Sequence, residues 1–456
     1  MLTLGNARIS SADTVTLITV SEQNLADLLF KGNTDIAETM NQILQAKESV
    51  NVARGELLPS IDLDLVNSFT SAPFFQANSI SCLVPFLFPS KWYDYHAAKD
   101  NYKAAVDGLY ATKLNAYAEA YTLAVRIQAD HTMADTMKDQ RDWVNNYVME
   151  LKTQADVGLA SRDDLLKGEL EAGQADVASS KASELVARER AAFRRLLGLE
   201  INQDFVIAVA APGPATFETM SISESVDQAV ERAVERDQLD DLIAGAKANV
   251  RSAEWAFLQG CSGDQGANGT SASSTGFGVD QRYQVGIGFG YWPRVKIAKD
   301  KLDALRIRQE ELRLEFGKNI ETTLTSLGET SKQVEYASAD VNVAETLLKE
   351  QMAYFEAGKG SAKDILVTYR DVTDARLTAI SSAADLAGHR ITLQRLALDD
   401  RFFQILIDSR RQVEIPHHKD DQAKTPPQPK PEKKKHEKKK HEKKKPGEHH
   451  EILSLN

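Results

Sequence analysis

The chain has 456 residues, of which 27% are charged and only 7% aromatic, a mixture that suits long, solvent-exposed helices better than a compact globule. The formal net charge is −11, but the stretch from residue 416 onward holds 12 lysines against seven acidic residues, so the preceding body carries −16. An acidic body argues against nucleic acid as a partner.

Residues 1–20 read as an N-terminal extension. Thr14 to Val20 is too short and too polar for the core of a signal peptide, and no basic stretch precedes it. We therefore expect that an export signal is missing from this chain or that its start is misassigned. No run of 18 apolar residues follows anywhere, so the sequence predicts no membrane-spanning helix.

Proline divides the remainder into two halves. Residues 90–211 and residues 294–415 contain no proline, and each span is 122 residues long. Because proline in a helix interior costs about 3 kcal/mol, such spans are typical of long helices. We predict a mainly α fold with two structural repeats, 21–211 and 212–411, each built as helix, extended segment, long helix, bend and helix.

In the first half, a helical pattern over 33–57 gives way to strict alternation at Ile61 to Leu65, which predicts a strand. A second extended run, 80–88, is closed by Pro89, so we expect a β-hairpin over 58–90. A helix of about 100 Å should follow over 91–157. Its apolar seam predicts coiled-coil packing rather than a ligand role for the tyrosines. The seam residues are Tyr110, Leu114, Tyr117, Tyr121 and Ala124.

The second half repeats this plan. One helix is expected over 223–258, followed by a segment with nine glycines between Gly260 and Gly290. The end of this segment alternates apolar residues with glycine up to Tyr291, which predicts a second β-hairpin over 259–293. The first strand of that hairpin has a low strand propensity, because it is rich in glycine. Long helices are expected over 294–357 and 362–397. The two cysteines, Cys82 and Cys261, fall in the two hairpin segments; we expect free thiols, with one long-range disulfide as the alternative.

One motif occurs at the bend of each half. Gly158 to Leu166 returns 200 residues later as Gly358 to Leu366, with Gly, Ser, Asp and Leu at the same steps. A glycine with positive φ can end the first helix, and the serine can cap the next one. The tips of two helical hairpins are therefore predicted at 158–166 and 358–366. A lone protomer would leave strand edges open, so we expect copies to close the strands into a barrel and the helices into a hollow cylinder.

From about Ser21 to Leu398 the sequence resembles the TolC-type outer membrane factor family. The resemblance implies a homotrimer with a twelve-stranded β-barrel in outer membrane lipid and an α-helical tunnel in the periplasm. It further implies passive export of substrates that an inner-membrane transporter and a periplasmic adaptor protein deliver, in efflux or type I secretion. The motifs that carry it are Ala53 to Ser60, Pro85 to Phe88, Gly158 to Leu166 and Phe355 to Leu366.

The resemblance also implies roles at the bends. Asp364, Asp164 and Asp163 match positions at the tunnel's narrow entrance, where a second acidic position is Val367 here. Alternatively, Asp164 and Asp364 only complement the dipole at a helix N-terminus. The residues that match the adaptor contact are Gly158, Leu159, Ala160, Ser161, Gly358, Gly360 and Ser361.

No enzyme, cofactor or metal site is predicted, because His96, His131 and His389 stand alone without a nucleophile or a ligand cluster. The alternative function is a coiled-coil scaffold that descends from such a channel but forms no pore; the absent export signal and the glycine-rich segment favour it. Residues 412–456 carry most of the histidines and repeated lysine runs, so we expect a disordered Lys/His-rich tail that binds anionic surfaces.

Overall fold

The computed structural model describes residues 16–58, 85–158, 160–214, 216–258 and 290–412. The chain divides into a unit of residues 1–411 and a C-terminal unit of residues 412–456. The architecture below belongs to the first unit. The tail therefore remains a prediction, because all of it but Gln412 lies outside the described residues.

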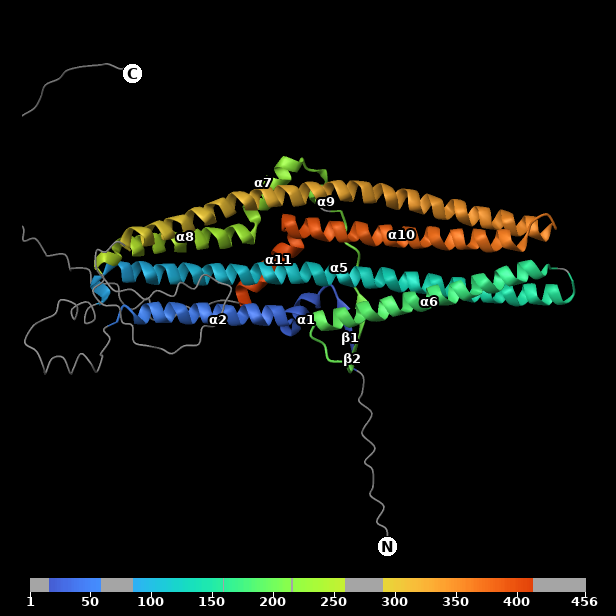
Figure 1. The fold of residues 1–456 in the computed structure, drawn as a ribbon, viewed down its shortest axis with the longest axis horizontal. Helices are drawn as coiled ribbons and strands as arrows, with labels where there is room; N and C mark the ends of the chain where they lie inside the picture. The colour runs from blue at the N-terminus through green and yellow to red at the C-terminus, as the bar shows by residue number, and fades with distance from the viewer. Residues whose placement is uncertain (1–15, 59–84, 159, 215, 259–289, 413–456) are drawn as a thin grey trace, which may run out of the picture. The chain divides into compact units, whose positions relative to one another are not determined.

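Two very long helices run along the first unit (Figure 1). Helix α5, Pro89–Asp156, has 68 residues, and α9, Tyr291–Glu356, has 66. Each turns back into a shorter helix that packs against its second half: α6, Arg162–Leu196, follows α5, and α10, Ala362–Ala397, follows α9. The proline-free spans thus form helical hairpins as predicted, and α10 has the predicted bounds.

Shorter helices pack against the first halves of the long ones. Helix α2, Thr34–Gly55, lies along α5, and α8, Val234–Trp255, lies between α5 and α9. Each follows a short helix, α1, Leu25–Gly32, or α7, Ile222–Arg232.

The expectation of one helix over 223–258 is wrong. Ala233 has extended backbone angles, φ −62° and ψ 125°, which end α7 and start α8. Its methyl group is 2% exposed within an apolar cluster with Leu239, Phe316 and Ile320. A bend that buries a small side chain carries no sequence signal, because alanine favours a helix. The last turn, Ala256–Leu258, is a separate 3₁₀ helix, η3.

A two-stranded parallel sheet, absent from the predictions, ties the region before α1 to the segment after α6. Strand β1, Thr16–Ser21, pairs with β2, Gln203–Ala208, so that Ile18 lies opposite Phe205. The ring of Phe205 is buried against Phe193 of α6. The predicted N-terminal extension therefore includes a strand: residues 16–20 are hydrogen-bonded to the segment that follows α6 in the first half of the chain.

The predicted tyrosine seam of α5 is confirmed as core packing. All five of its residues are buried, and Tyr117 and Tyr121 are among the most completely buried large side chains. Tyr117 meets the edge of Phe402 in α11, Asp400–Gln412, at a centroid distance of 5.5 Å. The hydroxyl of Tyr121 donates to the Ala210 backbone oxygen at 3.0 Å. The seam therefore anchors α11 and the segment after β2 to the long helix.

Two details of the predicted hairpins are wrong. Pro85–Leu87 forms a 3₁₀ helix, η1, and Pro89 starts α5 rather than closing a strand, which fits the preference of proline for the first helical turn. Tyr291 starts α9 and is not the end of a strand. Phe88 and Gly290 precede these two helices as their N-cap residues. The remaining expected strand residues and both cysteines lie outside the described residues.

Candidate functional site

The bend between α5 and α6 is built by one glycine and one capping serine. Gly158 has φ +79°, and its N–H donates to the Ala155 oxygen at 3.0 Å, which ends α5. The Ser161 hydroxyl accepts from the Asp164 N–H at 3.1 Å and donates to the Asp164 carboxylate at 2.6 Å. Asp164 is thus bound into the first turn of α6, where negative charge stabilises the helix.

The bend between α9 and α10 has the same local structure. Gly358 has φ +70°, and the N–H groups of the next two residues both donate to the Tyr354 oxygen, at 2.9 and 3.1 Å. Ser361 accepts from the Asp364 N–H at 3.2 Å and donates to the Asp364 carboxylate at 2.8 Å. A Cβ added at Gly360 would lie 3.0 Å from the Phe355 nitrogen, so this tight turn favours glycine.

The structure places the predicted site residues at two neighbouring bends, at the same end of the first unit (Figure 1). Asp364 and Asp163 are exposed, and Asp163 forms an ion pair with Lys167 one turn on. Asp164 is half-buried. Of the predicted adaptor-contact residues, three are exposed (Gly158, Ser161 and Gly358) and three are half-buried (Ala160, Gly360 and Ser361), while Leu159 lies outside the described residues.

An aromatic stack that the sequence analysis missed joins the two hairpins near these bends. Trp143 of α5 stacks on Tyr369 of α10 at a centroid distance of 3.8 Å and on Tyr147 of its own helix at 5.2 Å. The Tyr147 hydroxyl is buried without a hydrogen-bond partner, and burial raises the pKa of Tyr147 to about 12. The available signal was the spacing of two aromatics four residues apart, just before the bend.

Small and aliphatic residues extend this contact to the bends themselves. Ala362 and Leu366 of α10 are buried in one cluster with Leu151 of α5 and Ala172 of α6. The cluster continues through the half-buried Ala160 in the first bend. The two tips are therefore held together by side-chain packing, and displacing one from the other exposes this apolar surface.

A buried carboxyl pair lies farther along the same hairpin. Asp130 of α5 and Glu189 of α6 have side chains that are 7% and 15% exposed, beside the guanidinium of Arg126. Desolvation, together with a hydrogen bond to Asp130 and repulsion from its charge, raises the pKa of Glu189 to about 7. One oxygen of each carboxyl group is buried without a hydrogen-bond partner. The sequence gives no sign of this pair, since its members are 59 positions apart.

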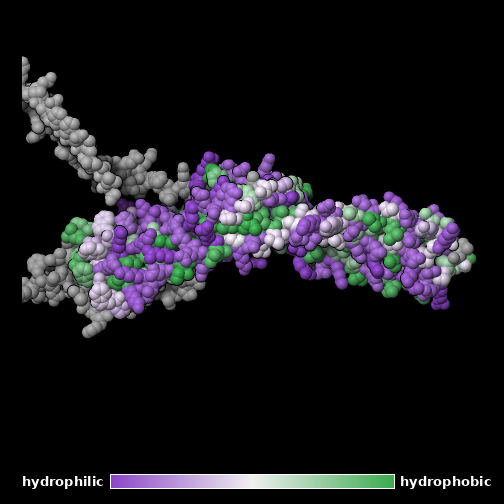
Figure 2. Space-filling view, turned by 90° about the horizontal axis from the view of Figure 1, so that it is seen from above, coloured by the Kyte–Doolittle hydropathy of each residue, from purple (hydrophilic) through white to green (hydrophobic). Residues whose placement is uncertain are grey.

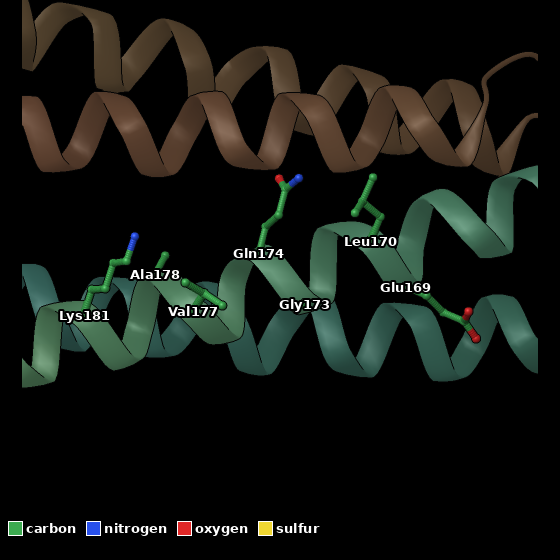
Figure 3. Close-up of a pocket in the computed structure, with 7 residues that line it drawn as sticks. All are labelled: Glu169, Leu170, Gly173, Gln174, Val177, Ala178 and Lys181. Atoms are coloured by element: carbon green, nitrogen blue, oxygen red, sulfur yellow. The ribbon is translucent and has the colours of Figure 1, made fainter.

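The surface of the first unit mixes polar and apolar residues (Figure 2). An open, mainly apolar hollow follows one side of α6, and its lining residues are labelled in Figure 3: Glu169, Leu170, Gly173, Gln174, Val177, Ala178 and Lys181. Within the described ranges, no group of three or more His, Cys, Asp or Glu residues could hold a metal ion. None of the described helices is both long and apolar enough to cross a membrane.

Comparisons with solved structures identify the fold. The chain matches the Campylobacter jejuni CmeC outer membrane channel with a TM-score of 0.67 and 13% identity, covering 90% of this chain and 97% of that one. A membrane protein from Pseudomonas aeruginosa matches with a TM-score of 0.64 and 14% identity, over 87% and 96% of the two chains. The open state of the Neisseria gonorrhoeae MtrE outer membrane channel matches with a TM-score of 0.59 and 15% identity, over 82% and 88%.

No protein-family model matches the sequence. No curated protein matches it either. The chain thus shares its fold with the CmeC and MtrE outer membrane channels over 90% and 82% of its length, which confirms the predicted resemblance to TolC-type outer membrane factors at the level of the fold.

Proposed function

We propose that this protein is a homotrimeric channel of the outer membrane, whose helical part forms a tunnel in the periplasm. It passively exports substrates that an inner-membrane transporter and a periplasmic adaptor deliver to the end formed by the two bends. The observation that supports this proposal is the fold shared with outer membrane channels over most of both chains. We propose that the two halves are structural repeats and that segments 58–90 and 259–293 contribute strands to a shared barrel.

In this proposal the two bends have two roles, one in the pore and one in adaptor binding. Asp364 and Asp164 line the narrow mouth of the tunnel, and the glycines and serines beside them contact the adaptor. Each carboxylate keeps a fixed position through its capping serine. Three copies of Asp364 around one opening would form a ring of negative charge inside low-dielectric walls, which favours cations.

Single-channel recording of the purified protein in planar bilayers tests this function. We expect discrete conductance steps, preference for cations, and a native mass of three chains in detergent. A trimer that never conducts, or recovery of the protein in the cytosol after cell fractionation, would replace the channel with the scaffold alternative.

A further inference from the structure

The carboxyl groups of Asp130 and Glu189 occupy positions in the α5–α6 contact that normally hold apolar residues. Glu189 comes three residues after Val186 and four before Phe193, both buried, which is the spacing of one helix face. On α5, Asp130 continues the buried face three residues after Ile127. The two carboxyl groups therefore meet inside the packed seam of the hairpin, where water does not solvate them fully.

On one side of this pair, both helices are fixed to strand β2. Arg190 and Arg194 of α6 donate to backbone oxygens of β2, at 2.9 and 3.3 Å. Gln128 of α5 donates to a third backbone oxygen of the strand, that of Ile207, at 3.2 Å. The end of the hairpin that lies next to β2 is thus held by hydrogen bonds that do not involve the carboxyl pair.

On the other side, toward the bend, the two helices pack loosely. None of residues 131–143 of α5 and 180–185 of α6 is buried, and the structure describes all of them. We call these two segments the loose stretch. On α5 it is about 20 Å long, and buried contacts resume at Val144. Asp130 is therefore the last buried residue of α5 before the helices become loosely packed.

The charges around the pair balance when it holds one proton. The Arg126 guanidinium lies 3.9 Å from Asp130 and 3.7 Å from Glu189, so it can offset one negative charge. A second negative charge on the pair would be left uncompensated in a largely buried place. One oxygen of each carboxyl group is buried without a hydrogen-bond partner, and a shared proton would satisfy such oxygens.

Other charged groups near the pair are turned to partners of their own. These ion pairs are His131 with Asp135, Arg188 with Glu184, and Arg190 with Asp204. Helix α10 packs on α5 with Gly388 beside Thr122, which brings the uncharged residues 379–382 to the level of the pair. The exposed Asp385 of α10 lies more than one turn from that level. Desolvation and Asp130 raise the pKa of Glu189 to about 7, so the proton is exchanged near neutral pH.

The second hairpin has no such pair. The bends repeat at an interval of 200 residues, so the positions equivalent to Asp130 and Glu189 are Thr330 and His389. Thr330 is buried and has no ionisable group. A response to pH that arises from the carboxyl pair should therefore occur in the α5–α6 hairpin and not in the α9–α10 hairpin.

We propose that one proton shared by Asp130 and Glu189 acts as a latch between α5 and α6, and that its release to solvent above neutral pH lets the helices separate along the loose stretch. Both ends of that stretch stay fixed, by β2 on one side and by the cluster around Leu151 and Ala172 on the other. The change is therefore a local opening in the middle of the hairpin. The latch itself does not depend on the proposed channel; only its effect on a tunnel wall rests on that function.

Hydrogen–deuterium exchange of the full-length protein, read by mass spectrometry, tests the latch. At pH 8, peptides from 131–143 and 179–186 should exchange about fivefold more slowly in Glu189→Gln than in wild type, because Gln keeps a donor and removes the charge. At pH 5.5 the two proteins should agree. Comparing proteins at one pH cancels the dependence of chemical exchange on pH. Peptides from 331–343 and 379–386, in the second hairpin, should not differ.

Two further variants make the result specific. Asp130→Asn removes the other carboxyl group and should slow exchange at pH 8 as Glu189→Gln does. Glu184→Gln changes an exposed carboxylate of α6 and should exchange like wild type. Wild-type exchange at pH 8 in both pair variants, or equal slowing in both hairpins, overturns the latch. Bilayer recording separates the channel from the latch: the expected exchange without conductance refutes only the channel, and conductance with unaltered exchange refutes only the latch.

Discussion

Replacing Glu189 by Gln should make the packing of α5 against α6 less sensitive to pH. Glu189 and Asp130 are both largely buried, and the pKa of Glu189 is raised to about 7, first by desolvation and then by Asp130. When the pair holds one proton, a hydrogen bond replaces the repulsion of two carboxylates. Gln keeps a donor at this position and removes the charge.

The direction of the pH effect on stability follows from which state, folded or unfolded, binds more protons. Because the pKa of Glu189 is raised above its ordinary value of 4.5 in the folded protein, the folded state holds more protons than the unfolded state between about pH 4.5 and pH 7. Stability from this group is present below that window and falls as the pH rises through it. A shift of this size corresponds to about 3 kcal/mol, which Arg126 and solvent screening reduce. We expect a loss of about 1 kcal/mol between pH 5.5 and pH 8.

Chemical denaturation at pH 5.5 and pH 8 measures this loss. Burial raises the pKa of Asp107 to about 6, so this residue also lowers the free energy of unfolding as the pH rises. The quantity to compare is therefore the difference in this loss between wild type and variant. Glu189→Gln should remove about 1 kcal/mol of the decline and be the more stable protein at pH 8. The control Glu184→Gln, on an exposed carboxylate of the same helix, should leave the decline unchanged. If Glu189→Gln is less stable than wild type at pH 8, the ionised form is favoured by Arg126 and our reasoning is wrong.

Other substitutions separate local roles from functional ones. Asp364→Asn should weaken the cation preference of the conductance while changing the free energy of unfolding by less than about 1 kcal/mol; unchanged selectivity would remove Asp364 from the pore. Trp143→Ala deletes the middle ring of the stack on Tyr369 and should cost about 2–3 kcal/mol, with faster hydrogen exchange near the bends as the local readout. Gly198→Ala should cost more than about 2 kcal/mol in denaturation, because it combines φ +64° with a Cβ 2.1 Å from a backbone oxygen. Gly328→Ala, on an open face of α9, should instead stabilise the protein by about 0.5–1 kcal/mol.

The long hairpins could be predicted because their signals are local. Absence of proline, apolar steps of three and four, and a glycine–serine pair at each bend predicted α5, α9 and α10 to within a few residues, and the bend at 158–166 placed the start of α6. The capping by Ser161 and Ser361 was predicted from the same motif and is confirmed by the hydrogen bonds to Asp164 and Asp364.

What the sequence could not predict depends on contacts between distant segments. Strand β1 exists because β2, nearly 190 residues later, supplies its hydrogen bonds. Gly198 follows the end of α6, and its close approach to the Gly32 backbone, which fixes α1 against the end of α6, needs both segments in place. The stack of Trp143 on Tyr369 likewise forms only once α10 has docked on α5.

The two interpretations of Asp364, helix cap and pore charge, are compatible in this geometry. Ser361 donates to one carboxylate oxygen, Oδ2, and the side chain as a whole is exposed at the tip. The hydrogen bond from Ser361 fixes the position of the carboxylate that a cation-attracting ring needs. The N-terminus of α10 adds a positive partial charge, which holds the carboxylate in place but also offsets part of its field. Loss of the Ser361 hydroxyl should therefore leave the cation preference in place and make the position of the charge less fixed, whereas loss of the Asp364 charge should weaken the preference.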